Sequence, residues 1–176
     1  MSAPAKSIEP LAERVDLLAE RIEPMAGLLY NRGVVGDLAA VVAPPYDLIG
    51  AARQRELYGR SPYNVVRLEL GRDDDPYAAA ARTLAEWRNA GVLERAHRRA
   101  IYLYTQTFEL EGRTHSRAGF IARIRLEEFS HGRILPHERT FPAAKADRLK
   151  LLIAIRTNVS PVFGLYSGQH PELDRL

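Results

Sequence analysis

The amino-acid sequence predicts an α+β fold with a mixed sheet and flanking helices. Segments with the apolar period of helices and segments with the β-branched, alternating character of strands both occur. They do not follow the strict strand–helix–strand order of α/β folds. The 176 residues suit one ordinary domain, and 46% hydrophobic with 27% charged residues is a globular composition. We therefore divide the chain into a helical N-terminal extension, 1–26, and a single α+β domain, 27–176.

The composition excludes several classes of site and location. The chain has no cysteine, which rules out disulfides, thiolate zinc sites, iron–sulfur clusters and a cysteine nucleophile. We expect no membrane span and no signal peptide, because no apolar run is long enough and the N-terminus is charged. These features predict a cytoplasmic protein. The net charge of +3 permits anionic ligands but gives little support to nucleic acid as a partner.

Residues 7–23 are predicted to form an amphipathic helix. Apolar residues recur there at spacings of three and four, and Glu and Arg fill the other face. The apolar stripe consists of Ile8, Leu11, Val15, Leu18 and Ile22. It can pack against the domain, or it can pair with a second copy of the chain in a homodimer, and the sequence leaves both arrangements open.

The first elements of the domain are predicted from short segments. LAAVVA at 38–43 has the character of a buried strand, which Pro44 would end because proline cannot donate to a strand ladder. AARQRELYGR at 51–60 predicts a helix. NVVRLEL at 64–70 predicts a strand, since it is β-branched and alternating.

The second half of the domain carries clearer signals. Asp75 and Pro76 form the start of a helix that stops near Gly91. Segments 100–110 and 115–126 predict two strands, joined by EGRT as a hairpin. Two further elements complete the domain: a helix beginning at Pro142 and a last strand over 162–166.

No well-known catalytic motif is present. The sequence has no P-loop, no G-x-G-x-x-G after a strand, no G-x-S-x-G elbow and no H-E-x-x-H helix. Its five histidines are scattered without ligand-like spacing, so we expect no structural metal.

Positive charge is concentrated between residues 131 and 156. Six Lys or Arg residues and two acids give this stretch a formal charge of +4, whereas the whole chain carries only +3. A helix that begins at Pro142 would present unpaired N–H groups, and Lys145 and Arg148 would share one of its faces. This arrangement can hold phosphate without a P-loop. The alternative is a solvated helix face on which Asp147 pairs locally.

The same stretch supplies groups for acid–base and metal chemistry. His137 or Glu138, just before the helix, can act as a general base. Alternatively, Glu138 and Asp147 can hold Mg²⁺.

Three further sets are candidates for substrate binding. Tyr46 and Asp47 follow two prolines in APPYD, where a stiff loop can carry binding residues or simply cap a turn. In the predicted strand 64–70, an inward-facing Arg67 needs a partner, which can be Glu69 or a phosphate. The alternative is that Arg67 and Glu69 face outward to solvent. Asn64 opens that strand.

The third set is a polar pair in the predicted hairpin. Gln106 stands among aromatic residues in the first strand, and Arg117 falls in the second. Such a pair can line a cleft, or the two residues can be cross-strand neighbours.

The order of several segments resembles a known family. VVAPPYDLI, SPYNVVRLELG, YLYTQTFE, RAGFIARIRLEE, ILPHERT, KADRLKLL and NVSPVFGLY occur in turn from about Tyr30 to Tyr166. This pattern is similar to the bacterial and archaeal family catalogued as domain of unknown function number 1015. Members of that family are usually more than twice as long. Their second half carries an Asp-Gly-His-His-Arg motif, like the phosphate-binding box of the ParB/sulfiredoxin-like fold. That motif is absent here, so the chain resembles the N-terminal portion of such a protein.

The resemblance implies an activity, because some members are similar to free L-serine kinases. It implies ATP or ADP and Mg²⁺ as cofactors, and a small-molecule substrate. It places the catalytic role on Glu138 or His137, with Asp47 binding an amino group or a metal. Phosphate or nucleotide binding falls to Arg139, Thr140, Lys145 and Arg148.

Two other functions stay open beside the kinase. A non-catalytic module that binds a nucleotide or a phosphorylated ligand can use the same basic site. Nucleic-acid binding, by analogy with ParB-like proteins, is the third reading, and the low net charge argues against it.

Overall fold

Two compact units make up the chain in the computed structural model, which describes residues 22–136 and 140–165. One unit is formed by Ala26–Arg98 and Gly132–Pro161; the described part of the other consists of 22–25, 99–131 and 162–165. Most of the predicted helix 7–23 lies outside the described residues. Its last two residues form a strand instead, β1 (Ile22–Glu23), because they pair with β6 (Arg123–Ile124).

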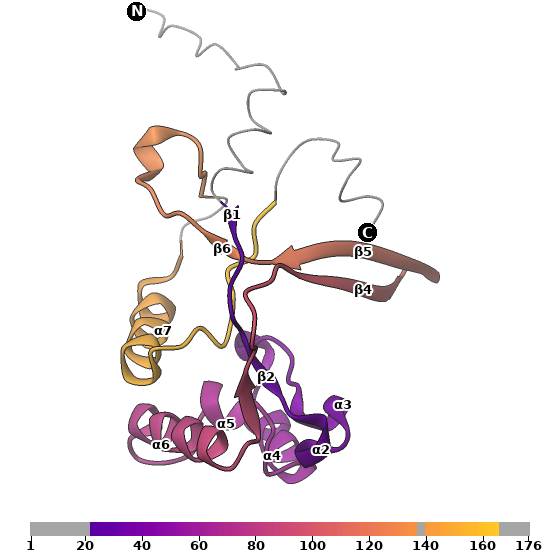
Figure 1. The fold of residues 1–176 in the computed structure, drawn as a ribbon, viewed down its shortest axis with the longest axis vertical. Helices are drawn as coiled ribbons and strands as arrows, with labels where there is room; N and C mark the ends of the chain where they lie inside the picture. The colour runs from indigo at the N-terminus through magenta and orange to yellow at the C-terminus, as the bar shows by residue number, and fades with distance from the viewer. Residues whose placement is uncertain (1–21, 137–139, 166–176) are drawn as a thin grey trace, which may run out of the picture. The chain divides into compact units, whose positions relative to one another are not determined.

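The first unit is mostly helical (Figure 1). In its described part, a strand pair joins β2 (Leu28–Tyr30) to β3 (Leu93–Arg95) in antiparallel register. Its helices are α2 (Arg32–Val35), α3 (Leu38–Val41), the 3-10 turn η1 (Tyr46–Leu48), α4 (Ala51–Arg60), α5 (Val66–Glu69), α6 (Pro76–Asn89) and α7 (Pro142–Ile155).

Helix α6 is at the centre of the core of this unit. Asp75 caps it by accepting hydrogen bonds from the N–H groups of Tyr77 and Ala78, at 3.1 and 3.0 Å. Gly91, with φ of 68°, allows the turn that ends it. The ring of Trp87 packs 6.1 Å from those of Tyr30 and Tyr63. Its partners in the core are Leu68, Ala80, Leu84, Val92, Leu93, Leu151 and Ile155.

The predicted strands 38–43 and 64–70 are wrong, because both segments form four-residue helices. Asp37 caps α3 by accepting from the N–H of Ala39 at 2.8 Å. A helix of four residues shows no 3.6-residue period, so its apolar letters resemble a strand. The predicted helices 51–60, 76–91 and the one from Pro142 are confirmed.

Asn64 ties α3 to α5 from a fully buried position. Its Nδ2 donates to the carbonyl oxygens of Ala40 and Val42, at 2.8 and 2.9 Å, and its Oδ1 accepts from the N–H of Val66 at 3.1 Å. Three of the four hydrogen bonds that the amide can make are therefore used by the fold.

The second unit contains a long hairpin, β4 (Tyr102–Leu110) with β5 (Arg113–Ile121), as predicted (Figure 1). Glu111 and Gly112, with φ of 52° and 71°, form its two-residue turn. The predicted second strand, 115–126, is divided between β5 and β6. The turn η2 (Phe129–His131) follows. The predicted strand 162–166 is not formed over 162–165, and Tyr166 lies outside the described residues.

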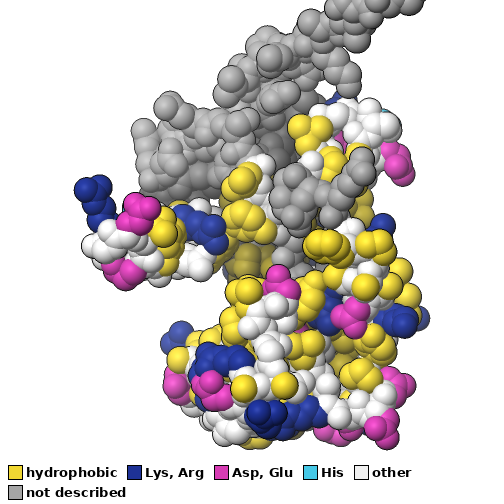
Figure 2. All heavy atoms as spheres, turned by 180° about the vertical axis from the view of Figure 1, so that it is seen from behind, with side chains coloured by type: hydrophobic (Ala, Val, Ile, Leu, Met, Phe, Trp, Pro, Cys, Tyr) yellow, Lys and Arg dark blue, Asp and Glu magenta, His cyan; other side chains and the backbone are white. Residues whose placement is uncertain are grey.

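The α+β class is confirmed. The described strands form three separate antiparallel pairs rather than one continuous sheet. Within the described ranges, no helix is both long and apolar enough to cross a bilayer. Figure 2 shows hydrophobic side chains at the surface, interspersed with charged ones.

The structure predicts that Asn64→Leu strongly destabilises the protein. The substitution leaves the carbonyl groups of Ala40 and Val42 and the N–H of Val66 without their partner, so we expect the free energy of unfolding to fall by about 3 kcal/mol. Urea denaturation of the variant measures this loss. Asn89→Leu, at an exposed position, is the control; an equal effect at both positions would contradict the role of Asn64.

Candidate functional site

The guanidinium group of Arg148 is the centre of the candidate site. Its Nε and Nη2 donate to Oδ2 of Asp147, at 2.8 and 2.5 Å, and Nη2 also donates to the carbonyl oxygen of Glu69 at 3.1 Å. The guanidinium carbon lies 4.1 Å from the ring centroid of Tyr46. Nη1 is buried, and no partner for it exists among the described residues. One donor nitrogen of the group is therefore unsatisfied.

Asp147 orients this guanidinium from the neighbouring position on α7. Its Oδ1 accepts a hydrogen bond of 2.7 Å from the hydroxyl of Tyr77 on α6. Partial burial opposes the charge of Asp147, but the hydrogen bonds from Tyr77 and Arg148 outweigh it and hold the pKa of the carboxyl below its usual value. The same bond raises the pKa of the Tyr77 hydroxyl. Asp147 is thus a stable anion whose two oxygens are both engaged.

Glu69 brings a buried carboxylate to the same place. Its side chain accepts a hydrogen bond from the hydroxyl of Ser160, and the residue is only 8% exposed. Burial raises the pKa of the Glu69 carboxyl, and the Ser160 hydrogen bond and the charge of Arg148 only partly oppose this. Burial, with a smaller effect from Glu69, also raises the pKa of Tyr30. Glu69 therefore holds a proton more readily than an ordinary glutamate does.

A small cavity of about 80 Å³ lies among these groups. Each water takes about 30 Å³ in the liquid, so the cavity has room for roughly two or three waters. A Cβ added at Gly71 would lie 3.1 Å from the Cβ of Pro76, so glycine permits the close approach of the chain at this wall. The cavity is lined by Glu69, Gly71, Pro76, Tyr77, Asp147 and Arg148, together with apolar side chains. It accommodates one small polar group and no whole nucleotide.

The structure brings together three of the predicted site residues: Tyr46, Asp147 and Arg148. Asp47 is exposed beside Tyr46 on η1. Thr140 and Lys145 are exposed at the start of α7, whose N-terminus has no side-chain cap.

Other predicted residues are placed elsewhere. Arg67 lies on helix α5, not on a strand face, and stacks over the ring of Tyr58 at 4.3 Å. Gln106 and Arg117 belong to the hairpin of the other unit, where Gln106 Oε1 accepts from Nε and Nη2 of Arg117 at 3.0 and 2.6 Å. They are cross-strand neighbours. His137, Glu138 and Arg139 lie outside the described residues.

Comparison with known proteins identifies the family. The model of a family described as "Protein of unknown function (DUF1015)" matches residues 22–176. The chain belongs to the DUF1015 family. No curated protein and no solved structure matches it. The family membership predicted from the segment order is confirmed, and the ParB-like relation and the kinase activity stay predictions.

Three residues of the candidate site were missed in the sequence: Glu69 as a cavity residue, Tyr77 and Ser160. A glutamate inside the apolar run VVRLEL was a usable signal, because a buried acid needs partners. Tyr77 and Ser160 gave no signal of their own, since their partners Asp147 and Glu69 are 70 and 91 positions away.

The described residues contain no group of three or more His, Asp or Glu side chains that could ligate a metal. The predicted magnesium pair of Glu138 and Asp147 stays a prediction, because Glu138 lies outside the described residues. The predicted ligand Asp147 already gives both oxygens to Tyr77 and Arg148. We therefore derive no step through a bound metal.

The raised pKa of Glu69 predicts a pH-dependent gain of stability in Glu69→Gln. The folded state binds the Glu69 proton more tightly than the unfolded state does, so the wild type loses stability as pH rises above the ordinary glutamate value. The variant has no such loss. We expect the difference in free energy of unfolding, variant minus wild type, to be larger at pH 7 than at pH 4. Urea titrations at the two pH values measure it.

The control for this experiment is Glu86→Gln, which changes an exposed carboxylate on α6. A difference between Glu69→Gln and wild type that is the same at both pH values would contradict the buried, proton-binding character of Glu69.

Proposed function

We propose that the chain is the phosphate-binding portion of a small-molecule kinase whose acceptor is an amino-acid hydroxyl, such as that of L-serine. The observation that carries this proposal is the buried Nη1 of Arg148, which has no partner among the described residues, on a residue that lines a small cavity. A buried donor without a partner costs about 1–3 kcal/mol. A ligand that supplies an anionic oxygen removes this cost and gains a charge-assisted hydrogen bond.

The surroundings of Arg148 favour a carboxylate or a single phosphoryl group as that ligand. Tyr46 and Asp147 hold the guanidinium plane, so little side-chain entropy is lost when an anion binds. Lys145 and the uncapped N-terminus of α7 add positive potential. Phosphoryl transfer needs this kind of positioning and charge neutralisation more than covalent chemistry. ATP or ADP is the donor that we propose, with Mg²⁺ carried on its phosphates.

Proton transfer is assigned to the segment before α7. In this proposal Glu138 takes the proton of the acceptor hydroxyl, and His137 is the second candidate for the base. Arg139 and Thr140 complete the phosphate-binding segment.

The size of the cavity favours a second candidate function. Pockets for whole small-molecule ligands occupy about 300–1,000 Å³, whereas this cavity has about 80 Å³. A non-catalytic module that captures one anionic group of a ligand needs no more space than this. Turnover separates the two functions, because the kinase consumes ATP and the module only saturates.

The proposal predicts that Arg148→Gln abolishes binding of a single phosphate or carboxylate group in the cavity. Thermal shift and calorimetric titration with inorganic phosphate and L-serine measure this. In the wild type, a ligand at a hundredfold excess over its Kd should add about 2.7 kcal/mol of stability. Arg148→Gln should remove this gain, since it removes the unpaired donor and the charge. Arg82→Gln, an exposed change on the same unit, is the control. Equal binding by both variants would sink the assignment of Arg148.

Catalysis gives a separate prediction for Glu138. Glu138→Gln should bind the same ligands as wild type and lose ADP release in the presence of L-serine, because the base is gone while the anion site is intact. Normal turnover in this variant would rule out Glu138 as the base. A wild-type chain that binds but releases no ADP would favour the binding module.

A further inference from the structure

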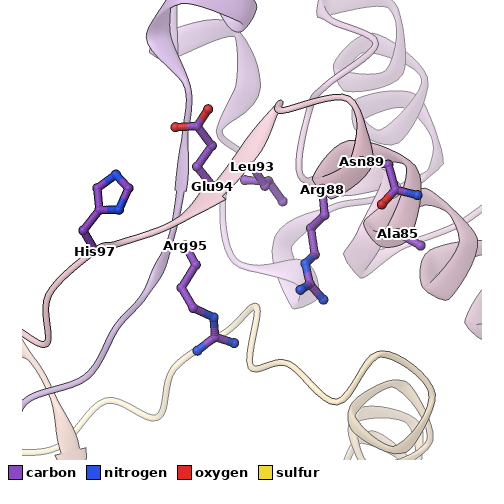
Figure 3. A pocket seen from close by; sticks show the side chains of 7 residues that line it. All are labelled: Ala85, Arg88, Asn89, Leu93, Glu94, Arg95 and His97. Carbon is purple, nitrogen blue, oxygen red and sulfur yellow. The ribbon is translucent and has the colours of Figure 1, made fainter.

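A second and larger hollow lies at the other end of α6. It has a volume of about 660 Å³ and is formed by the last turn of α6 and strand β3 (Figure 3). Its lining includes Arg88 and Asn89 of the helix, Leu93, Glu94 and Arg95 of the strand, and His97 just after the strand. Its size falls in the range of about 300–1,000 Å³ that is usual for small-molecule sites. We refer to it as the Arg88–Arg95 groove.

The two arginines of the groove carry uncompensated charge. Figure 3 shows their side chains extending to the same side of β3, while Glu94 and His97 extend to the other. The carboxylate of Glu94 accepts a hydrogen bond of 2.8 Å from the side-chain amide of Asn31. Within 22–136 and 140–165, neither Arg88 nor Arg95 forms an ion pair or side-chain hydrogen bond. From 88 to 99 the sequence has four arginines and one glutamate, so the surroundings are basic too.

The fold fixes the backbone positions that present these arginines. Arg88 follows the buried Trp87, and Arg95 lies two residues after the buried Leu93, on the same face of β3. The connection between them is tight, because the N–H of Val92 donates to the carbonyl oxygen of Trp87 at 2.8 Å. The backbone that carries Arg88 and Arg95 is therefore held by the buried residues Trp87 and Leu93. This limits the backbone entropy that is lost when a ligand binds.

We propose that the Arg88–Arg95 groove binds the diphosphate group of a small molecule. Two guanidinium groups supply forked donors that match phosphoryl oxygens, and two neighbouring phosphates engage both arginines at once. The amide of Asn89 adds a further donor. A single phosphate or carboxylate satisfies one arginine only, so it binds more weakly.

This site is separate from the Arg148 cavity. Pro76 lines the cavity and Arg88 lines the groove, and they stand 12 positions apart on α6. At a rise of about 1.5 Å per residue, this places them roughly 18 Å apart along the helix. A phosphoryl group in the groove is too distant for transfer to a group in the cavity, which requires reacting atoms about 3–3.5 Å apart. The groove therefore does not depend on the proposed kinase reaction.

A purely structural role is the competing explanation for Arg88. A cation in the last turn of a helix is favoured by the helix dipole. At this terminus, however, backbone N–H groups of Ala90 and Val92 already bind the carbonyl oxygens of Glu86 and Trp87, at 2.9 and 2.8 Å. A structural role would change stability, whereas a binding role would change affinity for diphosphates.

The test is calorimetric titration of the full chain with pyrophosphate, ADP and inorganic phosphate. We expect pyrophosphate and ADP to bind more tightly than phosphate, and Arg88→Gln/Arg95→Gln to weaken both by more than about tenfold. The charge-matched control is Arg82→Gln/Arg98→Gln, which removes two exposed arginines and should bind within about twofold of wild type. The Arg148→Gln variant should bind pyrophosphate like wild type.

Several results would overturn the proposal. The first is that wild type does not bind pyrophosphate at millimolar concentration. The second is that Arg88→Gln/Arg95→Gln and Arg82→Gln/Arg98→Gln bind it equally well. The third is that Arg148→Gln alone loses pyrophosphate binding. Thermal melts check that each variant is folded.

Arg88→Lys/Arg95→Lys keeps the charge but not the forked geometry, and an intermediate affinity is expected. ADP binding without pyrophosphate binding would place recognition on the nucleoside and would also contradict the diphosphate assignment.

Discussion

The packing of α7 against α6 is the constraint on which the candidate site depends. Leu151 and Ile155 bury one face of α7 in the core around Trp87. That contact sets the rotation of α7, so the residues one turn earlier, Asp147 and Arg148, face Tyr77 and Glu69. The apolar contact comes from two chain segments far apart in sequence, and the polar site is formed where they meet.

The polar groups at this contact are nearly but not fully balanced. Asp147 satisfies the hydroxyl of Tyr77 and two nitrogens of Arg148. The effect of burial on the Glu69 carboxyl is offset only in part by the Ser160 hydrogen bond and the charge of Arg148. Nη1 of Arg148 has no partner among the described residues. Buried polar networks that serve stability alone are expected to be complete. An unpaired donor beside a cavity is the kind of local cost that a binding site carries and a purely structural contact does not.

Elements with long periods or strong caps could be predicted from the sequence, and short ones could not. Helix α6 had Asp75 before its first turn and Gly91 after its last, and the β4–β5 hairpin had two long strands. The segments 38–43 and 64–70 contain as many apolar residues as a strand. In each segment a single polar side chain, Asp37 or Asn64, accepts a hydrogen bond from a nearby backbone N–H group. Such bonds favour a turn or a short helix over a strand.

The candidate site was predictable only as a set of residue types. The basic character of 131–156 pointed to Arg148, but its contacts with Tyr46 and Glu69 join segments about 100 and 79 positions away in the chain. No periodicity encodes such contacts, because tertiary packing determines them. For the same reason the sequence suggested Asp147 as a metal ligand. The structure shows its oxygens engaged by a tyrosine and an arginine, whose own positions depend on the packing of α6 and α7.

The two hollows of this unit differ in what they can recognise. The cavity at Arg148 selects by size, since about 80 Å³ admits one small group. The Arg88–Arg95 groove has about 660 Å³ and two arginines in its lining, so in our proposal it selects by charge. Residues near each end of α6 line them, so a ligand in either one would contact the same helix. If ordering of α6 couples the sites, thermodynamic linkage requires each ligand to change the affinity of the other by the same factor. Such reciprocity would distinguish a regulatory groove from an independent one.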